Sequence, residues 1–195
     1  MLLLDSGGQY KWGTKDVTRT LCFSKVSNRV KDIFTRVLKG HIAVALSNVK
    51  KERNGHNIDK IARKSLNSVG LDYRHGTGHG VGAFLNVHEG PQGISKNNYV
   101  KLKEGMILSN EPGYYETNKF GIRIENLIYI KREKNKNYFE NLTMVPIDKD
   151  LINKNLLNKS EIKWLNNYHM AVFNILKNSM NKFEILELQQ ACSAI

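Results

Sequence analysis

The sequence predicts an α+β fold, and three features of its 195 residues support this prediction. Segments rich in β-branched residues lie before and after a region with helical spacing, so strands and helices do not alternate regularly. Hydrophobic residues make up 41% of the chain and charged residues 25%, which are globular proportions. No apolar run approaches the ~20 residues that a membrane span needs. We therefore expect a globular chain that does not enter a membrane.

Two strands are predicted at the start of the chain. Residues 1–5, which are apolar up to Asp5, lead to Gly7 and Gly8, and this pattern indicates a strand that enters a turn. Residues 14–23 alternate and contain several threonines and a valine, which predicts a second strand.

Two helices are expected to follow. Ser27 is a suitable N-cap for a helix that runs to about Val49, with Gly40 as a local perturbation inside it. A second helix carries apolar residues at helical spacing between Ile58 and Val69 and should stop at Gly70.

The second half of the chain begins with an unusual segment, residues 74–93, which holds many glycines and three histidines and is predicted to be mostly loop. Strands are expected at 106–110, 121–130 and 138–147, and a helix at 160–179.

The net charge of +12 raises the question of nucleic-acid binding, because clustered Lys and Arg side chains neutralise phosphates. The basic residues are concentrated in residues 50–64 and 131–136, which look like a helix start and a solvated turn. No aromatic RNA-binding motif, paired-Cys finger or basic zipper accompanies them. We therefore favour a solvated surface and expect no nucleic-acid partner.

The cysteines and the N-terminus suggest a cytoplasmic protein. Cys22 and Cys192 are far apart in sequence and form no Cys-x-x-Cys pair, so a disulfide framework or a thiolate zinc site is excluded. The first five residues are too short for a signal peptide and lack its basic flank.

A set of acidic residues and one histidine occupies positions where a polar side chain would be costly in a core. The set comprises Asp5, Asp16, His79, Glu111 and Glu125. An ionised carboxylate beside a core needs a partner, or its pKa shifts and it becomes neutral. Four converging carboxylates would balance two divalent cations. Oxygen and imidazole ligands suit Mn²⁺, Co²⁺ or Zn²⁺. Taken singly, each residue is more often a surface or turn residue, and spacing alone does not show that they converge.

Six motifs in order then resemble the signatures of Xaa-Pro aminopeptidase (aminopeptidase P), in its longer, eukaryote-type branch. They are Leu3-Leu4-Asp5-Ser6-Gly7-Gly8-Gln9-Tyr10, Gly13-Thr14-Lys15-Asp16-Val17-Thr18-Arg19-Thr20, His75-Gly76-Thr77-Gly78-His79-Gly80-Val81-Gly82, Asn86-Val87-His88-Glu89-Gly90-Pro91, Asn110-Glu111-Pro112-Gly113-Tyr114-Tyr115 and Gly121-Ile122-Arg123-Ile124-Glu125-Asn126. The resemblance implies the pita-bread fold, shared with methionine aminopeptidase, prolidase and creatinase. Residues 140–146 and 164–169 resemble the C-terminal appendage of that branch.

The resemblance also implies metal ligands. Asp5, Asp16, His79, Glu111 and Glu125 match the five ligands of a dinuclear, usually manganese, centre. In the family pattern Asp16 and Glu125 bridge both ions, Asp5 holds one ion, and His79 and Glu111 hold the other.

Further roles follow from the same resemblance. Glu111 is the expected general base, and His75 and His88 are the expected substrate-site histidines. Arg123 is expected to orient ligand carboxylates. The alternatives are a plain loop hydrogen bond for His88 and a strand ion pair for Arg123. His41, His56 and His169 match no site motif and are interpreted as surface or core residues.

The reaction implied is hydrolysis of the N-terminal Xaa-Pro peptide bond by a dinuclear metal centre with a bridging hydroxide. The substrates would be peptides with proline in second position. One alternative is a truncated or split fragment that is inactive alone, and another is a non-catalytic pita-bread binding protein. Because all five ligands match, we favour the enzyme.

The resemblance covers only part of a complete family member. The first ligand, at residue 5, belongs near the middle of a pita-bread domain, so the chain resembles its C-terminal half. We expect this half over residues 1–134 and a small helical appendage over 135–195. A separately encoded N-terminal half and a homodimer are the implied partners. Lys15 departs from the family pattern, which has a hydroxyl residue beside the Asp.

Overall fold

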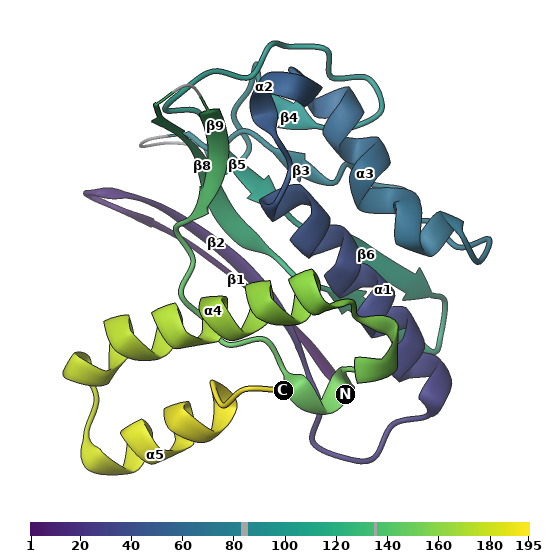
Figure 1. Ribbon diagram of the computed structural model, residues 1–195, viewed down its shortest axis with the longest axis vertical. Helices are drawn as coiled ribbons and strands as arrows, with labels where there is room; N and C mark the ends of the chain where they lie inside the picture. Colours follow the sequence, from purple (N-terminus) through teal and green to yellow (C-terminus); the bar gives the residue numbers. More distant parts are fainter. Residues whose placement is uncertain (83–85, 135) are drawn as a thin grey trace.

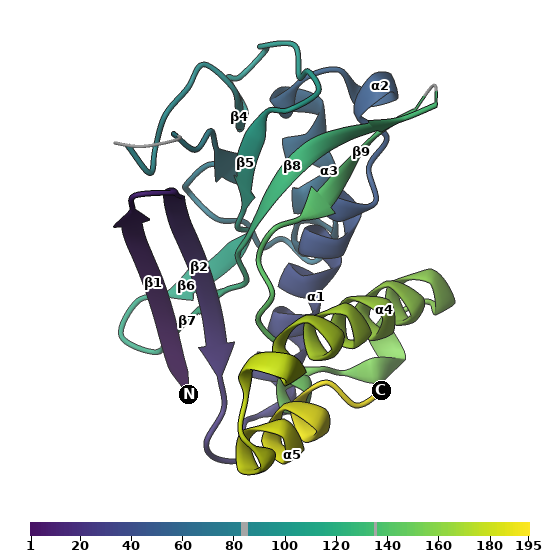
Figure 2. The same cartoon turned by 90° about the vertical axis from the view of Figure 1, so that its left-hand side faces the viewer.

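The structure is a computed structural model that describes residues 1–82, 86–134 and 136–195 (Figure 1). It confirms the α+β class. Strands occupy one side of the molecule, and helices α1 and α3 pack beside them. Figure 2, turned to face the strands, shows these helices behind them and the C-terminal helices at one end. None of the helices in the described ranges is both long and apolar enough to cross a membrane.

The chain begins with an antiparallel hairpin of β1 (Leu2–Tyr10) and β2 (Gly13–Leu21). The predicted turn at Gly7 and Gly8 is wrong, because β1 continues through both glycines and the chain reverses only at residues 11 and 12. The glycines pair with Asp16 and Lys15 of β2. In the described structure β1 pairs with β2 alone and much of it is exposed, so it tolerates residues of low strand propensity.

Helix α1 (Asn28–Ala45) is capped as predicted, since the Ser27 side chain accepts a hydrogen bond from the amide of Val30. It contains Gly40 without interruption. It ends at Ala45 rather than near Val49, because Asn48 caps a separate short helix, α2 (Val49–Glu52).

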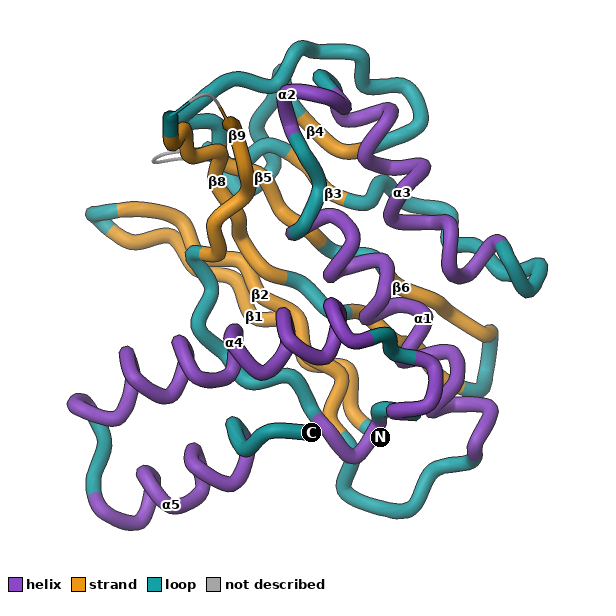
Figure 3. The backbone as a smooth tube through the Cα atoms, viewed as in Figure 1, coloured by secondary structure: helices purple, strands orange, loops and turns teal. Residues whose placement is uncertain are grey.

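Helix α3 (Gly55–Asn67) lies alongside α1 and ends, as expected, shortly before Gly70. The segment that follows is mostly loop in its described part (Figure 3). It contains two short paired strands, β3 (Gly78–His79) and β4 (Gly93–Ile94).

The second sheet has the strand order β5 (Ile107–Asn110), β8 (Asn126–Glu133) and β9 (Lys136–Asn141), and all its pairs are antiparallel. A separate hairpin joins β6 (Gly113–Glu116) to β7 (Phe120–Arg123).

Two of the strand predictions need correction. The predicted strand 121–130 is divided between β7 and β8. The division lies at Glu125, whose amide donates a hydrogen bond to the Thr18 carbonyl of β2. The predicted strand 138–147 ends at Asn141, since Leu142 and Thr143 both donate to the Leu127 carbonyl instead of continuing a regular ladder.

The C-terminal segment is helical, as predicted. The short 3-10 helices η1 (Lys149–Leu151) and η2 (Lys154–Leu156) lead into α4 (Lys159–Leu176), followed by η3 (Lys177–Ser179) and α5 (Lys182–Ala191). Helix α4 matches the helix predicted at 160–179, whereas α5 was not predicted individually.

The buried hydrophobic residues form two clusters. One lies under α3 and the second sheet and includes Ile58, Leu108 and Ile128. The other includes Phe34 of α1 and Leu165 of α4. This second cluster contains residues from both sides of the predicted domain boundary at 134–135, so the appendage packs on a core shared with the rest of the chain.

Candidate metal centre

All eight predicted site residues line one cavity of about 500 Å³. They are Asp5, Asp16, His75, His79, His88, Glu111, Arg123 and Glu125. They come from β1, β2, β3 and β7, from the segments before and after β3, from the loop after β5 and from the position between β7 and β8. Residues far apart in the sequence therefore meet at this cavity.

The β1–β2 register explains how the first two carboxylates meet. Asp5 pairs with Thr18, and Asp16 pairs with Gly7. Positions two apart on a strand share a face, so Asp5 and Asp16 are diagonal neighbours on the same face of the hairpin. Glu125 joins them because its backbone pairs with Thr18.

His79 is positioned by the close approach of the β3 backbone to the β5 backbone. A Cβ atom at Gly78 would lie 2.0 Å from the Ser109 carbonyl oxygen, so only glycine fits where β3 crosses β5. The His79 amide then donates to the Ser109 hydroxyl at 2.9 Å. As a result the His79 imidazole Nε2 lies 3.3 Å from Glu111 and 3.5 Å from Asp16.

Within the described residues, three sets of side chains offer ligand atoms that all lie within 4.8 Å of one another. One set is Asp5, Asp16 and Glu125, another is His79, Glu111 and Glu125, and the third is Asp16, His79 and His88. The first two sets share Glu125, and the first and third share Asp16, so the five predicted ligands form one continuous cluster.

The charges of this cluster are not balanced by protein groups alone. Burial, reinforced by the nearby Glu111 carboxylate, raises the pKa of Glu125 to about 7. Burial likewise raises the pKa of Glu111. Burial by itself would lower the pKa of His79, but Asp16 and Glu111 raise it above its usual value. Buried carboxylates that resist ionisation in this way fit a site built for added cations.

Neighbouring side chains orient the carboxylates. The Thr18 hydroxyl donates to Glu125 at 2.6 Å and accepts from Arg123 Nε at 3.0 Å. Arg123 also donates to Asp5 through Nη2. The Ser109 hydroxyl donates to Glu111 at 2.9 Å. Arg123 therefore contacts Asp5 directly and is linked to Glu125 through the Thr18 hydroxyl.

Tyr115 is a site residue that the sequence analysis missed. Its hydroxyl lies 3.0 Å from both His75 Nε2 and Arg123 Nη1. Because Arg123 is only a donor, the hydroxyl accepts from it and can donate to His75. The β6–β7 register pairs Gly113 with Arg123, which places Tyr115 diagonally beside Arg123, but that hairpin was not recognised in the sequence.

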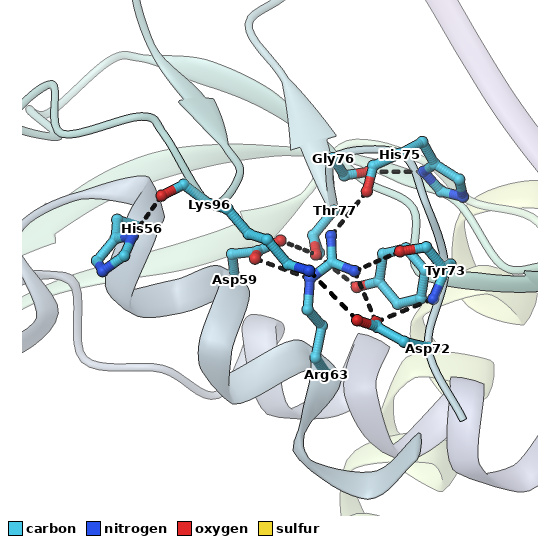
Figure 4. Close-up of polar contacts among 9 residues, drawn as sticks. All are labelled: His56, Asp59, Arg63, Asp72, Tyr73, His75, Gly76, Thr77 and Lys96. Atoms are coloured by element: carbon cyan, nitrogen blue, oxygen red, sulfur yellow. Dashed lines mark hydrogen bonds and ion pairs between the residues drawn. The ribbon is translucent and has the colours of Figure 1, made fainter. Parts of the chain in front are cut away.

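A network of polar contacts around the buried residues Arg63 and Asp59 holds the histidine-rich segment in place (Figure 4). The Arg63 guanidinium donates to Asp59 at 2.8 Å, to Asp72 at 2.7 Å and to the His75 carbonyl at 2.7 Å. The Thr77 hydroxyl donates to Asp59 at 2.6 Å. Residues on both sides of Gly76 are thus tied to α3. Asp59 and Arg63 lie four apart on that helix, a spacing that could have indicated the pair.

The three histidines without a site motif lie outside the cavity. His41 and His169 are fully buried in the core, and His56 is half-buried beside Tyr99.

Comparison with known proteins agrees with this geometry. The model of metallopeptidase family M24 matches residues 1–132, and the model of the C-terminal region of peptidase M24 matches residues 137–195. Aminopeptidase P2 from Arabidopsis thaliana is 51% identical over 89% of this chain, which covers 26% of that protein. Xaa-Pro aminopeptidase 1 from Dictyostelium discoideum is 50% identical over 88% of this chain, which covers 29% of that protein.

Solved structures show the same fold. An X-prolyl aminopeptidase from Caenorhabditis elegans, described as a cytosolic enzyme with a di-nuclear active site, has a TM-score of 0.91 at 40% identity. The match covers 99% of this chain and 33% of that one. Prolidase from Pyrococcus furiosus has a TM-score of 0.63 at 28% identity over 73% of this chain.

These matches confirm the expected pita-bread fold and its restriction to a C-terminal part. The chain spans about a third or less of the length of the aminopeptidases named above and 41% of the Pyrococcus furiosus prolidase. With one family model covering most of its residues and the other its C-terminal segment, the chain belongs to metallopeptidase family M24.

Proposed function

We propose that this chain provides the metal-binding part of an Xaa-Pro aminopeptidase, which hydrolyses the bond between an N-terminal residue and a following proline. The observation that carries the proposal is the convergence of four carboxylates and His79 in two sets that share Glu125. The names of the most similar relatives support the same substrate class.

The ligand set fits two divalent ions, for which we propose Mn²⁺, with Co²⁺ or Zn²⁺ as alternatives. Asp5, Asp16 and Glu125 would hold one ion. His79 and Glu111 would hold the other, together with Asp16 and Glu125. When bound, two such ions would activate a water molecule as the nucleophile and polarise the scissile carbonyl.

The chain's own groups have separate tasks. Glu111 would accept a proton from the attacking water, and the Ser109 hydroxyl fixes the orientation of its carboxylate. His75 is held by its neighbours, since Nδ1 lies 2.7 Å from the Gly76 carbonyl and Nε2 faces Tyr115. Burial, followed by the nearby Arg123 and Arg63, lowers the pKa of His75, so a neutral ring would face the substrate. We propose that the exposed His88, whose ring centroid lies 3.9 Å from that of His79, is the second substrate contact.

Metal titration tests the proposal. Calorimetry should give about two Mn²⁺ ions per chain, because the cluster offers two adjacent cation positions. Asp16→Asn should abolish the binding of at least one ion, whereas Glu133→Gln, an exposed position on β8, should leave both. Unchanged stoichiometry in Asp16→Asn, or no binding by the natural chain, would contradict the proposed site.

Activity also depends on the rest of a family member. We propose that the chain is cytoplasmic, acts with a separately encoded N-terminal half and pairs with a second copy of itself. Support comes from β1, which in the described structure pairs only with β2 and exposes Leu2 and Leu4. Full hydrolysis of an Xaa-Pro peptide by the monomeric chain alone would contradict this requirement, and sedimentation would detect a homodimer.

A further inference from the structure

A second and larger cavity, of about 770 Å³, lies apart from the candidate metal centre. It is lined by α2, by residues 99–104 and by the ends of β8 and β9, which Figure 1 shows at the end of the molecule away from α4 and α5. No residue lines both this cavity and the metal cavity. We call it the basic cleft, after the residues Lys50, Arg53, Lys101, Lys103 and Arg132 that line it.

The fold brings three distant stretches of sequence together at the basic cleft. The Leu102 amide donates to the Arg53 carbonyl at 2.9 Å, and Asn54 pairs with Lys101. Buried Val49 and Leu102 anchor the floor. The charged stretches 50–64 and 131–136, which the sequence analysis assigned to solvated surface, therefore both contribute to one concave site.

The charge of the basic cleft is not compensated by the described residues. Five cationic side chains line it and Glu104 is the one acidic residue among its lining residues. None of the five forms an ion pair with a carboxylate in residues 1–82, 86–134 and 136–195. Some basic residues outside the cleft are paired, as Lys119 is with Glu116 and Lys131 with Glu140. A concave surface with unpaired cations concentrates polyanions.

An exposed aromatic ring narrows the class of ligand. Tyr99 lines the basic cleft with 64% of its surface exposed, and its ring lies 4.6 Å from the ring of His56. A cationic groove combined with an accessible aromatic ring is the arrangement that holds single-stranded nucleic acid, with phosphates on the cations and a base on the ring. An acidic peptide would use the cations but would leave the ring without a partner.

We propose that the basic cleft binds single-stranded nucleic acid. This proposal reverses the expectation from sequence alone, which considered the basic stretches separately. It does not depend on the peptidase reaction, because the basic cleft and the metal cavity share no lining residue.

Fluorescence anisotropy with a labelled single-stranded RNA of about 12 nucleotides, and a DNA of the same length, tests the proposal. The variant Lys50→Gln/Lys101→Gln/Arg132→Gln should weaken binding about tenfold or more and reduce the slope of log K against log salt by about 2. The control Lys159→Gln/Lys163→Gln/Lys182→Gln removes the same charge from exposed positions of α4 and α5 and should bind as the natural chain does. Equal losses in the two variants, or no binding by the natural chain, would overturn the proposal.

A second variant separates base stacking from charge. Tyr99→Leu should weaken binding of the oligonucleotide about 5- to 100-fold while leaving inorganic polyphosphate binding unchanged. If Tyr99→Leu has no effect on the oligonucleotide, the cleft is a general anion site and the nucleic-acid assignment is wrong. Unchanged Mn²⁺ stoichiometry in every variant would show that the fold and the metal site are intact.

Discussion

Glu125 is the residue on which both candidate ion positions depend. It is only 2% exposed, and its one side-chain donor in the described structure is the Thr18 hydroxyl. Without cations, the ionised form of this carboxylate is disfavoured by burial and by Glu111. A buried, ionised carboxylate at position 125 is therefore unfavourable in the metal-free protein and favourable when cations are bound.

This conflict predicts a pH-dependent stability for the metal-free protein. The pKa of Glu125 is about 7 in the fold, against a usual value of 4.5, so the folded state holds a proton that the unfolded state has lost. The resulting stabilisation is complete below pH 4.5 and is lost as the pH rises through 7. Glu125→Gln should remove this dependence and raise the free energy of unfolding at pH 8 by about 1–3 kcal/mol. Urea unfolding of both proteins in the presence of a chelator, at several pH values, measures this difference in the free energy of unfolding.

Two comparisons accompany this measurement. Added Mn²⁺ should stabilise the natural chain at pH 8 but not Glu125→Gln, because the shared ligand is missing. Glu133→Gln on the exposed part of β8 should change neither curve. A metal-free Glu125→Gln protein that is less stable than the natural chain at pH 8 would refute the argument.

Arg19 links the metal-binding part to the C-terminal segment. Its buried guanidinium donates to the Glu125 carbonyl at 2.6 Å, to the Val145 carbonyl at 2.7 Å and to the Tyr168 hydroxyl at 3.0 Å. Burial lowers the pKa of Arg19, and no carboxylate in the described residues forms an ion pair with it. The positive charge of Arg19 is therefore surrounded by neutral hydrogen-bond acceptors.

Arg19→Met should lower the free energy of unfolding by about 3–5 kcal/mol, because it leaves several buried acceptors without donors. The matched change Arg36→Met, which removes a half-buried i, i+4 pair with Asp32, should cost about 1 kcal/mol or less. Chemical denaturation of both variants makes the comparison, and equal losses would show that the Arg19 contacts carry no special weight.

At the scale of elements, the approach of α1 to α3 depends on Gly40. A Cβ atom there would lie 2.4 Å from the Ala62 carbonyl oxygen, which is backbone and cannot rotate away. Gly40→Ala should therefore force the helices apart and lower stability by about 1–3 kcal/mol, although alanine is the better helix former. At Gly7 the nearest atom would be 3.6 Å away, so Gly7→Ala should have little effect. Thermal unfolding distinguishes the two, and a stabilised Gly40→Ala protein would contradict the packing argument.

The same elements show what the sequence could and could not predict. Predictions from local signals were confirmed. Ser27 caps α1, and α3 ends shortly before Gly70, close to the end of its apolar periodicity. The division of 121–130 at Glu125 was not predictable, because it depends on pairing with Thr18, a residue more than 100 positions earlier.

For the candidate site, too, local motifs were predictive and tertiary contacts were not. The residues predicted as ligands were found through their motifs, and the structure gathers all of them in one cavity. Tyr115 and Arg63 were missed because their importance lies in tertiary contacts with His75, which no local pattern reveals.

At the scale of the whole molecule, the C-terminal appendage behaves as part of one cooperative structure. Helix α4 shares a hydrophobic cluster with α1, and Lys39 of α1 donates to Glu161 of α4 at 2.7 Å. His169 of α4 is fully buried, and its Nε2 accepts a hydrogen bond from the Ile147 amide at 3.1 Å. Its Nδ1 is buried and has no partner in the described structure.

This environment makes His169 a source of acid sensitivity. Burial, followed by the positive charges of Lys149 and Arg19, lowers the pKa of His169 to about 4, against a usual value of 6.5. The unfolded state therefore binds a proton more readily than the folded state, and the stabilisation present above pH 6.5 is lost as the pH falls towards 4. His169→Gln keeps an acceptor for Ile147 but cannot titrate. Between pH 7 and pH 4.5 it should lose about 1–3 kcal/mol less stability than the natural chain. The control variant His56→Gln, which lies outside the core, should lose as much stability as the natural chain. If His169→Gln also loses as much stability as the natural chain across this pH range, protonation of His169 does not loosen the appendage.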